Sequence, residues 1–276
     1  MIVFLALNSS KNMSNGAGMK FGYFTMGEIY YGRWWALITS AFVHVEPMHI
    51  FFNMYWLWIL GPVIERQFGA LNFLAFILGT AFVSSGWQIA TSHGGIGFSG
   101  VGYAIIGFGW LAREKYPNLR PYFSDRTLQI FAGWAVLCVF LDYFNIQHIG
   151  NVAHIMGAAS GALVALAFIR KQWIAQVGLL LVAGAAIIPV YYSPLSAQWN
   201  FEMGYKATVR RDLDSAIRYY HQCIIRGYDS YEPWYNIALI EGQRGHTAEY
   251  KTAIKELRRI KPSETAGLVQ EFGDPK

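Results

Sequence analysis

The sequence predicts an all-α protein, in which a membrane-embedded bundle of helices is followed by a small soluble helical domain. Of the 276 residues, 54% are hydrophobic and only 14% are charged, which is typical of a membrane protein with some soluble mass attached. Apolar stretches follow one another up to about residue 192, and from about Ala197 the composition becomes polar. The ten Trp and 17 Tyr residues fit the aromatic belts found at membrane interfaces.

Six apolar stretches make up the predicted bundle. They cover about residues 49–67, 71–91, 98–112, 128–144, 149–169 and 173–192. Most have the length of about 20 residues that a bilayer requires. The stretch at 98–112 is shorter and follows a glycine cluster at 94–97, so we expect this helix to begin below the membrane surface. Non-helical backbone at that depth is tolerated only where it is buried in protein or lines a wet cavity, which indicates a water-accessible site.

The first apolar segment, Met1–Leu7, is too short to cross a bilayer and has no basic residues before it, as a signal peptide would. We expect it to belong to a first membrane helix that is truncated in this sequence. The predicted divisions are therefore residues 1–171 for a six-helix core, 172–195 for an additional seventh helix and 196–276 for a helical tail.

Basic residues predict the topology. They occur in alternate loops, at Arg66, at Arg113, Lys115, Arg120 and Arg126, and at Arg170 and Lys171. The loops at 92–97 and 145–148 carry no Lys or Arg. The positive-inside rule then places the basic loops in the cytoplasm, and the other two loops and the C-terminal tail on the outer side. The modest net charge of +5 reflects this topology and gives no reason to expect nucleic-acid binding.

The tail resembles tetratricopeptide repeats in two windows 34 residues apart. The matching residues are Gly204, Ala216 and Tyr220 in the first window, and Trp234, Ala238, Gly245 and Pro262 in the second. Tyr250 stands where the repeat pattern prefers Ala, and a plain helical hairpin remains open as an alternative. In either case we expect the tail to present a surface for a protein partner or for assembly.

Ser99 is the first candidate for chemistry, because it begins the short apolar helix within the run Gly97-Phe98-Ser99-Gly100. A serine there can cap the helix. It can also act as a nucleophile, since a helix N-terminus offers backbone donors to a developing oxyanion. The flanking Gly97 and Gly100 would let a substrate backbone approach closely.

His154 lies inside the apolar stretch at 149–169, where a polar side chain is costly and therefore a functional candidate. Gly157 and Gly161 share its helical stripe and favour close helix packing. The histidine could simply hydrogen-bond a neighbour. However, serine needs a base to become a nucleophile, and histidine is the usual base, so we expect Ser99 and His154 to form a pair.

His49 and Asn53 are four residues apart and so lie on one face of a helix. Both can donate hydrogen bonds, as a side-chain oxyanion hole requires, although contacts between helices are the simpler alternative. A metal site is a weaker hypothesis. His44, Glu46 and His49 are near one another in sequence, but there is no His-Glu-x-x-His run, and His93, His148 and His154 lie on other segments.

Taken together, these motifs resemble the rhomboid family of intramembrane proteases, in the family's order and with similar spacings. The likeness covers about residues 27–170. It rests on His49-x-x-x-Asn53, on Gly97-x-Ser99-Gly100 and on Ala153-His154-x-x-Gly157.

The resemblance implies a Ser99 nucleophile and a His154 base without a third acidic residue. It assigns oxyanion stabilisation to His49, Asn53 and the Ser99 N–H group, and it makes Tyr103 an aromatic residue that packs against the catalytic histidine. It implies no cofactor. It also implies single-span membrane proteins as substrates, and an active site that opens to the extracytoplasmic side of a bacterial inner membrane.

Two alternatives to proteolysis remain. A rhomboid-like pseudoprotease would bind membrane clients without cutting them, although such proteins normally lack the serine or the histidine. A membrane-tethered scaffold would act through the repeat-like tail.

Overall fold

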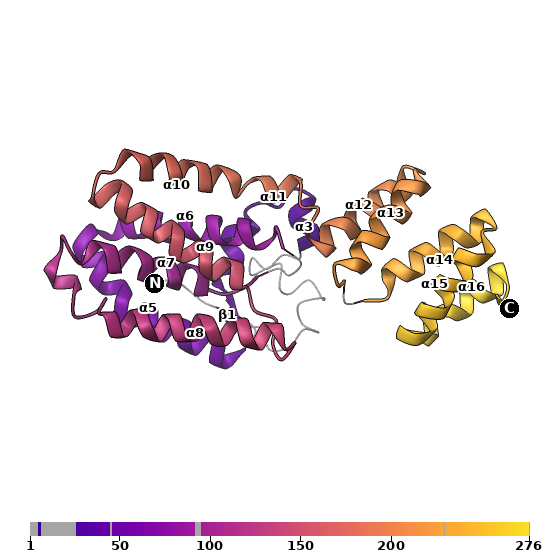
Figure 1. Cartoon of the computed structure of the whole chain (residues 1–276), viewed down its shortest axis with the longest axis horizontal. Coiled ribbons are helices and arrows are strands. Elements are labelled where there is room, and N and C mark those ends of the chain that lie inside the picture. The colour runs from indigo at the N-terminus through magenta and orange to yellow at the C-terminus, as the bar shows by residue number, and fades with distance from the viewer. Residues whose placement is uncertain (1–4, 7–25, 45, 92–94, 229, 276) are drawn as a thin grey trace. The chain divides into compact units, whose positions relative to one another are not determined.

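The computed structural model describes residues 5–6, 26–44, 46–91, 95–228 and 230–275. The chain divides into two compact units, Met1–Tyr192 and Ser193–Lys276, and each is described here by itself. Apart from one pair of two-residue strands, the described elements are helices (Figure 1). The predicted all-α class is therefore confirmed in outline.

The first unit is a bundle of long helices that alternate in direction (Figure 1). Its main elements are α5 (Pro47–Phe68), α6 (Ala70–Gln88), α7 (Ser99–Ala112), α8 (Asp125–Tyr143), α9 (Asn151–Val164) with its π-helical extension η3 (Ala165–Ile169), α10 (Trp173–Ala185) and α11 (Ile188–Tyr191). Shorter elements before α5 are α3 (Met26–Tyr30), α4 (Ala36–Thr39) and the 3-10 turn η1 (Ser40–Phe42). The helices follow the six predicted apolar stretches to within a few residues.

Three helical segments among the described residues are long and apolar enough to cross a membrane. They are Ala70–Gln88, Asn151–Ile169 and Trp173–Tyr191. The helix Ser99–Ala112 is apolar but shorter, as its sequence predicts. Helices α5 and α8 have 22 and 19 residues, enough for a span, but more polar side chains. This pattern is that of an integral membrane protein.

The prediction that Met1–Leu7 belongs to a membrane helix is wrong for the two residues that the structure describes there. Leu5–Ala6 form strand β1, which pairs in parallel with strand β2 (Val43–His44). This pairing lies next to the start of α5. The other five residues of the segment lie outside the described residues.

Helices α7 and α9 approach each other closely because two glycines of α9, one turn apart, each lie against the backbone of α7. A Cβ added to Gly157 would collide with the carbonyl oxygen of Gly100, and one added to Gly161 would collide with that of Ala104. Small residues are what allow membrane helices to pack this closely. The glycine stripe noted in the sequence therefore sets the distance between the helices that carry Ser99 and His154.

Loops with basic residues gather at one end of the bundle, as hydrogen bonds between its segments show. Asn118, after α7, donates to Gln67 near the end of α5 at 2.8 Å. The Lys115 ammonium group donates to the carbonyl of Ile169, the last residue of η3, at 3.2 Å. The starts of α5, α7 and α9 lie at the opposite end. Which end faces the cytoplasm remains a prediction.

The additional helix α10 packs on α9 and is fastened to the bundle by hydrogen bonds near both of its ends. Near its C-terminal end, Trp87 of α6 donates to the carbonyl of Val182 at 3.1 Å, and a Cβ on Gly86 would collide with the carbonyl oxygen of Ala186. Near its start, Gln176 donates to the carbonyl of Ala167 in η3 at 3.1 Å. Helix α10 thus contacts α6 near one end and η3 near the other, with α9 between them.

The second unit consists of helices packed on their own apolar core. They are α12 (Ala197–Val209), α13 (Leu213–Ile225), α14 (Glu232–Arg244), α15 (Thr247–Ile260), the 3-10 turn η4 (Pro262–Glu264) and α16 (Thr265–Phe272). Tyr250 is buried and its hydroxyl donates to the carbonyl of Leu268 at 3.0 Å, which explains a tyrosine where a repeat would have alanine. The assignment of the tail to a repeat family stays a prediction.

The close packing of α7 and α9 predicts that Gly161→Ala destabilises the bundle. The new methyl group meets the Ala104 carbonyl, so the helices must separate, at a cost of about 1–3 kcal/mol. We expect the Tm of the protein in detergent to fall by roughly 5 °C. Gly184→Ala is the matched control, since a Cβ there meets nothing within 4 Å. Equal Tm values for the two variants would contradict this account of the packing.

Candidate active site

Ser99 is held at the start of α7 by the turn before it. Gly97 has φ +101°, a left-handed conformation that favours glycine, and a Cβ at this position would also collide with the His49 ring. The Gly97 N–H group donates to the carbonyl of Ser40 at 3.0 Å. The glycine thus bends the chain, brings it against α5, and leaves Ser99 at the helix N-terminus.

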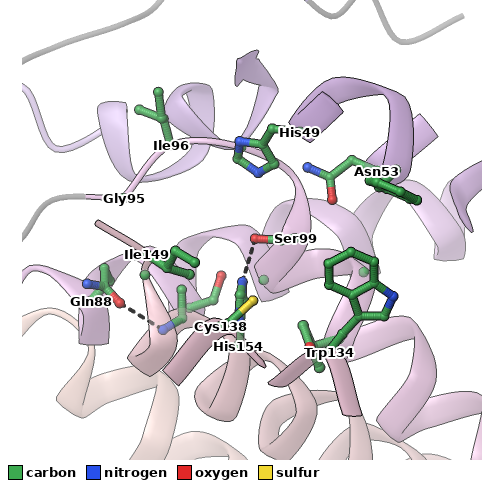
Figure 2. A pocket seen from close by; sticks show the side chains of 18 of the residues that line it. His49, Asn53, Gln88, Gly95, Ile96, Ser99, Trp134, Cys138, Ile149 and His154 are labelled. Atoms are coloured by element: carbon green, nitrogen blue, oxygen red, sulfur yellow. Dashed lines mark hydrogen bonds between the residues drawn. The ribbon is translucent and has the colours of Figure 1, made fainter. Parts of the chain in front are cut away.

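The Ser99 hydroxyl oxygen lies 2.8 Å from Nε2 of His154 (Figure 2). The two residues are 55 positions apart in sequence and come from neighbouring helices, α7 and α9. His154 is buried, with 6% of its surface exposed. The structure therefore brings together the two residues that the sequence analysis paired, at hydrogen-bonding distance.

The imidazole of His154 is oriented by an aromatic neighbour. The Tyr103 ring stacks on it, with 4.5 Å between ring centroids and 25° between planes. The Tyr103 hydroxyl donates to the carbonyl of Phe131 in α8 at 3.1 Å. Nδ1 of His154 is buried and has no hydrogen-bond partner among the described residues. Ring stacking and the serine thus fix the orientation that an aspartate fixes in soluble triads.

His49 and Asn53 lie on the other side of Ser99 from His154 (Figure 2). They are on consecutive turns of α5, as their spacing predicts. One amide hydrogen of Asn53 points to Nε2 of His44, at 2.8 Å. An asparagine amide has a second hydrogen, which is available to an oxygen in the cavity.

His44 is the residue whose part in this site the sequence analysis missed, having considered it only as a metal ligand. It is fully buried, and its Nε2 is approached by two N–H groups, those of Asn53 and of the Phe98 backbone at 3.2 Å. Its ring also packs edge-on against His49, with centroids 4.8 Å apart. His44 thereby holds α5 and the turn before Ser99 together.

Gln88, at the end of α6, is a second residue that sequence reasoning missed. Its side-chain oxygen accepts the N–H of Ala153 at 2.9 Å, so it satisfies a free donor in the first turn of the His154 helix. A polar residue at the end of an apolar stretch was the available signal. Asp142 secures the same helix start from α8, accepting from the Ile149 N–H at 3.2 Å and from Asn151 at 3.1 Å.

A cavity of about 310 Å³ surrounds these groups. The candidate residues Ser99, His154, His49 and Asn53 all line it, as do Gly97, Gly100 and Tyr103. Trp134 and Phe52, from α8 and α5, pack against each other with centroids 5.1 Å apart and form part of its apolar wall. A polar pair and an apolar wall in one cavity suit a peptide segment with hydrophobic side chains.

The metal-site alternative finds no support in the geometry. Within residues 26–44, 46–91, 95–228 and 230–275, no three His, Cys, Asp or Glu side chains come close enough to share a metal ion.

Comparisons with known proteins agree with the geometry of this site. A family model for the rhomboid domain matches residues 31–171, which is just over half of the chain. Rhomboid protease GlpG of Serratia proteamaculans is 35% identical over 139 residues, 49% of this chain and 48% of that protein. The proteins of the same name from Yersinia pestis and Pectobacterium atrosepticum are each 36% identical, over 48% of this chain and 47% of their own length.

The class that the fold and the site define is thus a helical membrane protein with a serine–histidine pair in an internal cavity. The chain belongs to the rhomboid family. It spans about half the length of the curated relatives that it matches, and its tail lies outside the matched region.

The environment of His44 predicts a pH dependence of stability. Burial, with a smaller contribution from the neighbouring His49, lowers the pKa of His44 from 6.5 to about 4. Between pH 6.5 and 4 the unfolded chain therefore binds a proton at this histidine and the folded protein does not. The contribution of His44 to the free energy of unfolding is complete above pH 6.5 and is lost as the pH falls towards 4. The loss amounts to at most about 3 kcal/mol.

The measurement is Tm in detergent across pH 4 to 8 for the wild type and for His44→Gln, whose side chain does not titrate. We expect a steeper fall below pH 6.5 in the wild type. Parallel curves would show that His44 does not carry the effect, because the other histidines are common to both proteins.

Proposed function

We propose that this chain is an intramembrane serine protease that hydrolyses peptide bonds within or next to the membrane-spanning segments of other proteins. The observation that carries the proposal is the 2.8 Å contact between the Ser99 hydroxyl and Nε2 of His154, inside a cavity of a membrane-embedded bundle. Family membership supports the same activity.

In the proposed reaction, His154 takes the Ser99 proton as the serine oxygen attacks the scissile carbonyl. For Nε2 to accept that proton, Nδ1 must carry the ring's own hydrogen. The Tyr103 ring, stacked at 4.5 Å, keeps the imidazole in place during the transfer. His154 then returns the proton to the leaving amine, and water hydrolyses the resulting acyl-enzyme.

The oxyanion of the tetrahedral intermediate would be stabilised by His49, the free amide hydrogen of Asn53 and the Ser99 N–H group. The side chains of His49 and Asn53 lie on the side of Ser99 opposite His154 (Figure 2). Losing one such donor typically costs about 10²–10³ in rate. Because His44 and Gly97 hold Asn53 and the start of α7 in position, this arrangement is formed before substrate arrives.

The proposed substrates are single-span membrane proteins whose helix unwinds locally near small residues. A regular helix hides its carbonyl groups in hydrogen bonds, so the protease must capture a frayed segment. The basic loops at the other end of the bundle support an active site that opens to the extracytoplasmic side. We place the protein in a bacterial inner membrane and its tail, available to a protein partner, on the outer side.

The direct test is cleavage of a single-span reporter by the purified full chain in liposomes. Ser99→Ala and His154→Ala are each expected to abolish cleavage, because the nucleophile or its base is lost. Cys138→Ala, a cavity-lining change without a proposed role, serves as the matched control and should retain activity. Cleavage that survives Ser99→Ala would overturn the dyad, whereas a wild type that binds but never cuts the reporter would favour a client-binding pseudoprotease.

Removal of residues 197–276 tests the scaffold alternative. The bundle has its own apolar core, so we expect cleavage of the generic reporter to persist within about twofold of the full-length rate. Loss of cleavage in a truncated protein whose bundle remains folded would instead assign the tail a necessary part in activity.

A further inference from the structure

A second cavity is also lined by α6 and α9 but shares no lining residue with the active-site cavity. It is an apolar groove of about 660 Å³. Its walls are residues 72–83 of α6 and 179–183 of α10, its floor is formed by residues 160–169 of α9 and η3, and Phe108 and the end of α5 close it below. None of the candidate catalytic residues lines it.

The groove exists because α10 does not follow α6 along its whole length. The two helices are joined where Trp87 donates to the Val182 carbonyl and where Gly86 meets Ala186. At its other end, α10 is attached to η3 through Gln176. A wedge is therefore left between α6 and α10, closed towards Val182 and open towards the end that carries the basic loops.

The length of the wedge limits what can fill it. The lining residues of α6 span eleven steps along the helix, from Asn72 to Val83, which corresponds to roughly 16 Å. The hydrocarbon core of a bilayer is about 30 Å thick. The groove thus extends through one leaflet and ends near the middle of the membrane, so a spanning helix of a partner cannot lie along it, whereas an acyl chain can.

The open end of the groove is positively charged. Ile169 lines the groove, and its carbonyl holds the Lys115 ammonium group at 3.2 Å. Lys171 follows two residues later, in the turn between η3 and α10, where it is exposed and forms no ion pair with any described residue. A cation beside an apolar groove at the membrane surface is suited to a lipid phosphate.

We propose that this groove binds one anionic glycerophospholipid, with an acyl chain between α6 and α10 and the phosphate at Lys171 and Lys115. The lipid would belong to the leaflet on the side of the basic loops. The bound chain fills the wedge that α10 leaves, so the lipid also fastens the additional helix to the core. The inference depends on the bundle lying in a membrane and not on its catalytic activity.

The test is native mass spectrometry of the purified full chain titrated with phosphatidylglycerol or with phosphatidylcholine of the same chain length. We expect one phosphatidylglycerol molecule to bind, and at least fivefold more tightly than phosphatidylcholine. Gly79→Leu should weaken its binding by roughly tenfold, because Gly79 lines the groove and a side chain there enters open space. Lys171→Gln should reduce the preference for the anionic lipid about fivefold while leaving the groove unblocked.

Two controls separate the groove from the general surface. Gly184→Leu adds the same side chain to α10 at an open position that does not line the groove, and Lys255→Gln removes an exposed charge from the tail. Both should bind lipid as the wild type does. Equal binding of the two lipids, or Gly79→Leu binding as tightly as Gly184→Leu with unchanged helix content, would overturn the proposal. A Gly79→Leu effect on dimer formation instead of lipid binding would also overturn it.

Discussion

The contact on which this structure depends is the one between α7 and α9, where glycine on one helix faces backbone carbonyls of the other. Gly157 lies one turn beyond His154 and packs on Gly100, one residue beyond Ser99. Because the residues that set the helix separation adjoin the proposed catalytic pair, any increase in that separation directly lengthens the hydrogen bond between Ser99 and His154. The 2.8 Å distance between Ser99 and His154 is thus set by the packing of α7 against α9.

A second constraint comes from the membrane itself. The bilayer core offers no water to satisfy polar groups, yet the site needs a helix start, two histidines and an asparagine within the bundle. The protein supplies the partners from its own chain: Gln88 for the first turn of α9 and His44 for Asn53 and for the turn before Ser99. These residues make no proposed contact with substrate, but without them the site would contain unsatisfied donors, which are costly in such surroundings.

Most helices of the bundle could be predicted because a long apolar stretch can be recognised in the sequence without knowledge of tertiary contacts. The helices lie where the apolar stretches lie, and the short α7 was expected from its glycine-rich start. The first segment could not be predicted in this way, since seven apolar residues fit a strand as well as the end of a helix, and Leu5–Ala6 pair with β2 instead. His44 was missed for a related reason: it lies nine residues before Asn53 and outside the helix, so no periodicity connects them.

Helix α10 is attached to the bundle and yet leaves a groove between itself and α6. Full-length packing against α6 would need small residues along the whole contact, as between α7 and α9. In α6 such a close contact occurs at Gly86, whereas nearer the basic loops a Cβ added to Gly79, which lines the groove, would meet nothing within 4 Å. The groove left between the two helices is too short for a spanning helix, and its lining is mostly apolar. A membrane protein need not fill such a space with its own side chains, because its solvent consists of flexible apolar chains that can.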